Sequence, residues 1–258
     1  MLTVPVSVVI PVKDDARLLE RCLASLAAQT VRPLEILVVD NGSADESADV
    51  ARRFGATVLT EREPGIAAAS GTGYDAARGR ILARCDADSI LPVDWLSRIA
   101  VRFAADEDLA ALTGPGRFYG LTTAQRLLAD VLYMRAYFVT VGTALGHPPL
   151  FGSNLALRAA DWQRVRGEVH RHDLLMHDDI DLSVHLGPVR RIRYDRRLIV
   201  EISGRPISDR SGMGLRMRRG FHSLFAHWPA EFPPSRYLQR LRAKRSSARA
   251  PHCTRPPA

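Results

Sequence analysis

Residues 81–89 read ILARCDADS, and this stretch decides how the rest of the chain is interpreted. Its apolar start predicts a short buried strand, which gives way at once to Asp86 and Asp88. Open α/β sheets bind ligands at the carboxyl ends of their strands, so both carboxylates are expected in a crevice at that edge. On an extended chain they point to the same face, where they repel each other unless a cation or a proton lies between them. The pair therefore predicts a site for a hard cation such as Mg²⁺ or Mn²⁺, with a solvated turn as the alternative.

The sequence on both sides alternates between strand and helix patterns. Apolar, often β-branched runs predict strands at residues 6–10, 34–39, 57–59 and 109–113. Apolar residues at helical spacing predict helices at about residues 16–29, 44–54, 65–78 and 92–103, the last with Pro92 in its first turn. Strands that alternate with helices indicate an α/β fold, here a single domain with a mainly parallel sheet and helices on both faces.

Length and composition agree with such a fold. The pattern changes near Pro115, which separates a regular, nucleotide-type half at about residues 1–115 from a less regular half at about residues 116–235. Hydrophobic residues make up 46% of the chain and charged residues 25%, as in ordinary soluble globular proteins. Residues 4–12 read as a core strand rather than a leader, and three scattered cysteines form no disulfide pattern. We therefore expect a reducing cytoplasm.

Two later segments are unusual in hydropathy or charge. Residues 124–145 are strongly apolar, but three charged residues interrupt them, which is costly inside a bilayer. We expect an amphipathic helix that lies mostly in the core, with a position on a membrane surface as the alternative. Residues 236–258 hold six arginines, Lys244 and no acidic residue, so this tail carries +7 of the net charge of +8. It is expected to be flexible, and either simply solvated or bound to an anionic membrane surface.

Four motifs follow one another in a recognisable order. They are VSVVIP at residues 6–11, VVDNGS at residues 38–43, DAD at residues 86–88 and HDDIDL at residues 177–182. In this order they resemble the family-two glycosyltransferases with the GT-A fold, over about residues 4–186. The resemblance implies a hexosyltransferase-type enzyme whose first half binds a nucleotide-diphosphate sugar and whose second half binds the acceptor.

The resemblance assigns the first three motifs to the donor. Asp40 would accept hydrogen bonds from the base or ribose, Asp86 would lie toward the ribose, and Asp88 would bind the metal that bridges the diphosphate. Pro11 and Lys13, at the end of the first strand, are assigned to the same nucleotide site. For Asp40 by itself, a turn-forming role at the end of its strand is the alternative.

The fourth motif resembles the acidic dyad of the family, normally Glu-Asp and here Asp178-Asp179. Asp179 would be the general base that deprotonates the acceptor hydroxyl, with Asp178 and Asp181 as neighbouring carboxylates that raise its pKa. All three also suit the N-terminus of a helix, whose dipole favours acidic side chains. The shorter side chain at position 178 leaves the acceptor contacts there open.

Two further segments complete the expected site. Asn154, in a Gly-Ser-Asn turn, would lie under the donor sugar, with a plain turn as the alternative. Arg216 and Arg219 would cover the diphosphate, for which arginine has the bidentate geometry, with a solvated basic helix as the alternative. The Gln-x-x-Arg-Trp motif of processive synthases is absent, which argues against the synthesis of long polymers.

One departure from the family pattern concerns phosphate binding. The usual Ala-Arg-Asn triplet has Ser70 at its centre here, so an arginine that could reach the phosphates is missing. Lys13, Arg62 or Arg84 is the candidate substitute. The missing arginine keeps open a catalytically inert binding module of the same fold. A nucleotidyltransferase can also carry paired carboxylates at a strand end, but its glycine-rich basic loop is not seen after Pro11.

The predicted function is therefore metal-assisted sugar transfer, expected to be inverting. By resemblance, the acceptor is a glycan of the cell envelope or a lipid-linked glycan. We expect a cytoplasmic protein, with peripheral contact at the inner face of an anionic membrane as an option, and no nucleic-acid partner.

Overall fold

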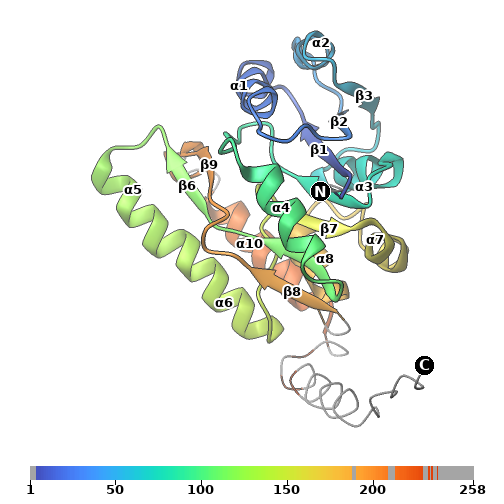
Figure 1. Cartoon of the computed structure of the whole chain (residues 1–258). Helices are drawn as coiled ribbons and strands as arrows, with labels where there is room; N and C mark the ends of the chain where they lie inside the picture. The colour runs from blue at the N-terminus through green and yellow to red at the C-terminus, as the bar shows by residue number, and fades with distance from the viewer. Residues whose placement is uncertain are drawn as a thin grey trace, which may run out of the picture.

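The computed structural model describes residues 4–187, 190–208, 213–228, 232, 234 and 237. Seven strands of this described part form the central sheet (Figure 1). In spatial order they are β3 (Thr57–Thr60), β2 (Glu35–Asp40), β1 (Val6–Val12), β4 (Ile81–Arg84), β7 (Leu155–Arg158), β5 (Leu109–Thr113) and β8 (Arg191–Tyr194). β7 runs antiparallel to both neighbours and the remaining pairs are parallel. The mainly parallel α/β sheet predicted from the sequence is confirmed.

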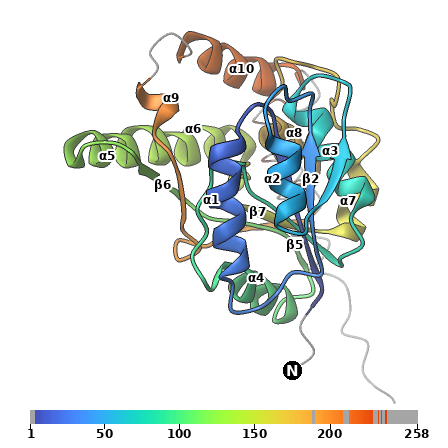
Figure 2. The ribbon, with the colours of Figure 1, turned by 90° about the horizontal axis from the view of Figure 1, so that it is seen from above.

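Helices cover both faces of this sheet, as predicted (Figure 2). On one face lie α1 (Ala16–Ala27), α2 (Ser47–Arg53) and α4 (Trp95–Ala104), and on the other lie α3 (Ile66–Ala76), α7 (Ala159–Val165) and α8 (Asp178–Leu186). The alternation of side chains along β1 explains this division, because Val8 and Ile10 pack with the first group and Val9 packs with the second. A central parallel strand buried on both faces needs such a continuous apolar run.

Two boundaries predicted at prolines are wrong. Pro11 lies inside β1 instead of closing it, because the next residue, Val12, still pairs with Asp40 of β2. Pro92 precedes α4, which begins at Trp95, instead of lying in its first turn. The turn before α4 is held by Gln29 of the α1 end, whose side chain donates to the Pro92 carbonyl at 2.7 Å.

The apolar segment 123–145 is one continuous helical rod along the side of the molecule, away from β3 (Figure 1). It consists of α5 (Thr123–Ala129), a π-helical turn η1 (Asp130–Arg135) and α6 (Ala136–Leu145). The prediction that it lies mostly in the core is wrong, because only 17% of its apolar window is buried. Leu128 and Leu132 are each about 60% exposed. By length and composition alone, this helix could cross a membrane.

A small second sheet and two further helices complete the described part of the fold. β6 (Gly116–Tyr119) pairs in parallel with β9 (Val200–Ser203) in a separate two-stranded sheet. α9 (Arg205–Ser208) follows, and α10 (Met213–Phe225) packs against α8 (Figure 2). Apart from Tyr237, the basic tail predicted at residues 236–258 lies outside the described residues.

Candidate active site

The acidic motifs meet at one edge of the central sheet. β2, β1 and β4 are parallel, so their carboxyl ends lie together, and Asp40 and Asp86 stand at or just beyond two of those ends. β7 is antiparallel, so the turn that precedes it, with Ser153 and Asn154, arrives at the same edge. This is the edge of the sheet at which Asp86 and Asp88 were expected to bind a ligand.

The loops after β1 and β2 are joined to each other by hydrogen bonds. The Ala16 amide donates to Asp45 at 2.8 Å, and the Ala44 amide donates to Asp14, which has a left-handed φ of 51°, at 2.7 Å. Lys13 is exposed in the first of these loops. Asp40 accepts the Ser43 amide at 3.0 Å, so it does form the turn that was weighed as its alternative role.

Arg84 lies at the centre of the site and joins two of the acidic motifs. Its side chain is only 1% exposed, Nη2 donates to Asp86 Oδ1 at 2.9 Å, and Nη1 donates to Asp178. Burial disfavours the charge of Arg84, but Asp178 and Asp86 outweigh that effect and raise its pKa further. Among the three predicted substitutes for the arginine missing at Ser70, Arg84 is the one paired with both motifs. Its buried ion pairs mean that it holds carboxylates in place rather than facing solvent.

The turn before β7 closes over this arginine. Ser153 Oγ donates to the second oxygen of Asp86 at 2.5 Å. A Cβ atom at Gly152 would lie 3.0 Å from Nη2 of Arg84, so a glycine lets the turn approach the guanidinium closely. Asp86 is therefore held from two sides, by Arg84 and by Ser153.

Asp88 has a different environment from Asp86. Its side chain is 18% exposed, and burial followed by the neighbouring Asp86 carboxylate raises the pKa of Asp88 to about 6. Arg205, at the start of α9, approaches Asp88 at 3.3 Å and forms a bidentate pair with Asp15 at 2.9 and 2.6 Å. Carboxylate oxygens are the ligands that a hard divalent cation such as Mg²⁺ or Mn²⁺ prefers, so Asp88 fits such a cation.

Arg205 was missed by the reasoning from sequence. It is 55% exposed, in contrast to Arg84, and lies next to the predicted metal residue Asp88. The feature of the sequence that could have identified Arg205 is its position two residues after the end of β9. An exposed arginine beside a carboxylate at this edge can contact an anionic ligand.

The two residues of the acidic dyad begin α8 and point to different partners. Asp178 turns toward Arg84, and burial raises the pKa of Asp178 although Arg84 lowers it. Asp179 accepts the Gly152 amide at 2.8 Å through Oδ2 and the Ile180 amide at 2.8 Å through Oδ1. Asp179 and Asp86 therefore both contact the turn at residues 152–153, but only Asp86 is also paired with Arg84.

The remaining predicted site residues are buried or half-buried, or their side chains lie outside the described part of the chain. Asn154 is fully buried, accepts from the Trp95 indole at 2.9 Å and donates to the Leu198 carbonyl at 2.6 Å, so its position does not fit a donor contact. Pro11 is buried within β1. Arg219 is half-buried on α10, whereas the Arg216 side chain on the same helix lies outside what the structure describes.

Sequence comparison decides the family. The model of "Glycosyl transferase family 2" matches residues 7–157, which is more than half of the chain. The chain belongs to this family. The glycosyltransferase AglE of Haloferax volcanii is 37% identical over 101 residues, covering 36% of this chain and 33% of the relative. A "PGL/p-HBAD biosynthesis glycosyltransferase" of Mycobacterium bovis is 31% identical over 157 residues, covering 53% of this chain and 61% of that protein. The chain thus matches a third to three-fifths of the length of these relatives.

Solved structures agree on the fold. The mannosyltransferase PcManGT from Pyrobaculum calidifontis, in complex with GDP-Man and Mn²⁺, superposes with a TM-score of 0.66 at 22% identity, covering 96% of this chain and 76% of that one. Residues 1–349 of TarS from S. aureus superpose with a TM-score of 0.61 at 14% identity, covering 95% of this chain and 73% of that one. These are GT-A glycosyltransferases, so the predicted GT-A fold is confirmed.

Proposed function

We propose that this glycosyltransferase-family protein transfers a sugar from a nucleotide-diphosphate donor to a hydroxyl acceptor, with inversion and with the help of a divalent metal. The observation that carries the proposal is the meeting of Asp86, Asp88, Asp178 and Asp179 at one sheet edge, with Arg84 between the two motifs. Family membership and neighbours crystallised with nucleotide sugars and Mn²⁺ support it.

The donor half of the site would use residues with distinct tasks. Asp40 and Lys13 would contact the base and ribose, and Asp88 would hold the cation, either Mg²⁺ or Mn²⁺. When bound, the cation neutralises the charge that develops on the leaving nucleoside diphosphate. Arg205 faces the same region and supplies a second positive group for the diphosphate. The donor role first predicted for Asn154 is not part of this proposal, because Asn154 is enclosed in the core.

The acceptor half would use Asp179 as the general base. Its two oxygens already accept backbone amides, which orient the carboxylate below the turn at Gly152. An in-line attack by the acceptor hydroxyl, with its proton passed to Asp179, inverts the anomeric centre. Asp178 takes no proton in this scheme, since Arg84 is its partner and its task is to keep the first turn of α8 in place.

The acceptor class follows from a surface of the molecule and from the relatives. The helical rod at residues 123–145 exposes leucines and valines on a side away from the sheet. Such a face can rest on a membrane, where lipid-linked acceptors are found. The mycobacterial relatives are named PGL/p-HBAD biosynthesis glycosyltransferases, and the order of motifs resembles family members that act on envelope glycans. We therefore propose a cytoplasmic enzyme in peripheral contact with the membrane and with a lipid-linked or envelope glycan as acceptor.

A panel of nucleotide sugars tests the proposed function. Each sugar is added to the protein with and without Mn²⁺, first in a thermal-shift screen and then in an assay for released products. We expect one sugar nucleotide to raise the melting temperature only with metal, because a ligand of the native state stabilises it. Slow release of nucleoside diphosphate should accompany this. Binding without turnover would identify an inert module, and release of sugar 1-phosphate and nucleoside triphosphate only when pyrophosphate is added would identify a nucleotidyltransferase.

A further inference from the structure

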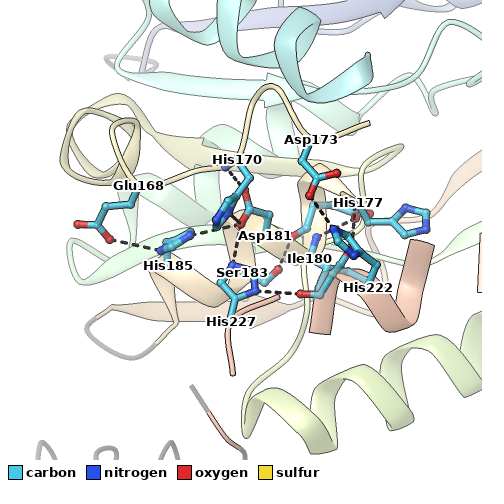
Figure 3. Close-up of polar contacts among 12 residues, drawn as sticks. Glu168, His170, Asp173, His177, Ile180, Asp181, Ser183, His185, His222 and His227 are labelled. Carbon is cyan, nitrogen blue, oxygen red and sulfur yellow. Dashed lines mark hydrogen bonds and ion pairs between the residues drawn. The ribbon is translucent and has the colours of Figure 1, made fainter. Parts of the chain in front are cut away.

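A cluster of three histidines and one aspartate, which does not include the metal residue Asp88 proposed above, gathers on and beside α8 (Figure 3). Asp181 and His185 stand one turn apart on α8, His170 lies in the segment between α7 and α8, and His227 follows α10. One ligand atom from each of the four residues lies within 4.8 Å of the other three. Three separate segments of the chain therefore converge on a single point.

That point is one oxygen of Asp181, whose side chain is 2% exposed. Oδ2 accepts the backbone amide of His170 at 2.7 Å. Oδ1 is approached by Nδ1 of His170 at 2.9 Å, Nε2 of His227 at 2.9 Å and Nε2 of His185 at 3.3 Å. Oδ1 has two lone pairs, which the contacts from His170 and His227 already use, so the nearby Nε2 of His185 is left without a hydrogen bond.

The ring of His227 has an acceptor on each side. Nδ1 lies 2.9 Å from the carbonyl oxygen of Ser223, which can only accept, so Nδ1 carries a proton. Nε2 then faces the Asp181 carboxylate, which also only accepts. A neutral imidazole has a single N–H group, so the second contact requires either another proton or a cation.

His185 presents the same problem. Its Nδ1 lies 3.3 Å from the carboxylate of Glu168, and its buried Nε2 makes no hydrogen bond to the residues that the structure describes. Protonating all the rings would place like charges close together, because the ring centroids of His170, His185 and His227 are 5.1 to 6.0 Å apart. A single divalent cation among the four ligand atoms would satisfy every lone pair at once.

We propose that Asp181, His170, His185 and His227 bind one Zn²⁺ ion. Three imidazole nitrogens and one carboxylate oxygen form a closed tetrahedral set, and imidazole is a preferred ligand of zinc. In such a site, neighbouring ligand atoms are about 3.3 Å apart; here the distances to Oδ1 are 2.9 to 3.3 Å and all four ligand atoms lie within 4.8 Å of one another. Glu168 and the Ser223 carbonyl supply the outer contacts that typically orient metal-bound histidines.

The ion has a structural role that follows from where its ligands lie. It fastens the end of α10, through His227, to α8 and to the segment before α8. Because α8 begins with Asp178 and Asp179, the zinc site steadies the helix that carries the acidic dyad. Loss of zinc should therefore lower the melting temperature of the whole chain.

The test uses the full chain, stripped with a chelator and then freed of it. Titration with ZnCl₂ against a chromophoric competitor is expected to show one tight equivalent, and Co²⁺ is expected to give the strong visible absorption of a tetrahedral complex. His185→Gln should weaken zinc binding by more than about 100-fold, since even changes to outer contacts cost 10- to 100-fold. Glu168→Gln, which leaves all four ligands, should weaken it by about 10- to 100-fold.

Two control variants make the outcome decisive. His172→Gln alters an exposed histidine of the same segment and should bind zinc normally. Asp88→Asn removes the proposed catalytic metal residue and should also keep the tight equivalent. Absence of a tight zinc equivalent in the wild-type chain, or its loss in Asp88→Asn, would overturn the proposal. An equal loss in His172→Gln and His185→Gln would do the same.

Discussion

Replacing Arg84 with methionine should destabilise the protein more than almost any other single change of a charged residue. Arg84 is 1% exposed and balances Asp86 and Asp178, whose side chains are 29% and 14% exposed. Removing one partner of a buried ion pair leaves an uncompensated charge and typically costs about 3–5 kcal/mol. Since whole domains are stable by only about 5–15 kcal/mol, this is a large fraction of the total. Urea denaturation of the wild type and Arg84→Met at pH 8 measures the loss.

Three comparisons make the Arg84 experiment specific. Arg52→Met removes an exposed pair with Asp49 and should cost less than about 1 kcal/mol. Adding Asp178→Asn to Arg84→Met should recover part of the stability, because one unbalanced carboxylate is gone. The deficit should also shrink from pH 8 to pH 5, since a carboxyl whose folded pKa is raised takes up its proton more readily in the folded state. A loss below about 1 kcal/mol at pH 8 would refute the balancing role of Arg84.

The remaining predictions concern the base, the buried amide and the helical rod. Asp179→Asn should bind the sugar nucleotide normally yet lower kcat by about 100- to 10,000-fold, whereas Asp178→Asn should lose less; steady-state kinetics with the reverse order would reassign the base. Asn154→Ala should cost about 1–3 kcal/mol in thermal unfolding for each polar group left unsatisfied, with no selective effect on donor affinity. Leu128→Glu combined with Leu132→Glu should reduce co-sedimentation with anionic vesicles, and unchanged sedimentation would exclude the rod as a membrane contact.

The sheet could be predicted because its signals are local. Central strands buried on both faces need unbroken apolar runs, and helices need apolar residues at 3.6-residue spacing, so both are visible in single windows of sequence. The helix start predicted at Pro92 was wrong for a tertiary reason. The side chain of Gln29, just after α1, forms hydrogen bonds that fix the turn before α4. The burial predicted for the helical rod at residues 123–145 was wrong because apolar composition does not reveal which side of a helix packs against a neighbour. Its exposed leucines become visible only when the packing is known.

The sequence predicted only those residues of the candidate site whose motifs follow one another in the order typical of the family. Asp40, Asp86, Asp88 and the dyad stand in a recognisable sequence, and the structure gathers their elements at one edge of the sheet. Asn154 was misplaced because a Gly-Ser-Asn turn looks the same whether its amide faces a ligand or the core.

Long-range partners were beyond the reach of the sequence. Arg205 pairs with Asp15 across a separation of 190 residues, which no local pattern indicates. The histidine cluster likewise draws His170, Asp181, His185 and His227 from three segments, and only two of them share a helix.

Calorimetry of nucleotide binding shows whether Asp88 holds a cation that the donor needs. Calorimetry should be run with UDP and GDP, each with and without Mn²⁺, on the wild type and on Asp88→Asn. We expect the wild type to bind at least one nucleotide tightly only when Mn²⁺ is present. Asp88→Asn, folded as judged by circular dichroism, should lose this metal-dependent binding. Unchanged metal-dependent affinity in Asp88→Asn, or equal affinity of the wild type with and without Mn²⁺, would contradict a metal site at Asp88.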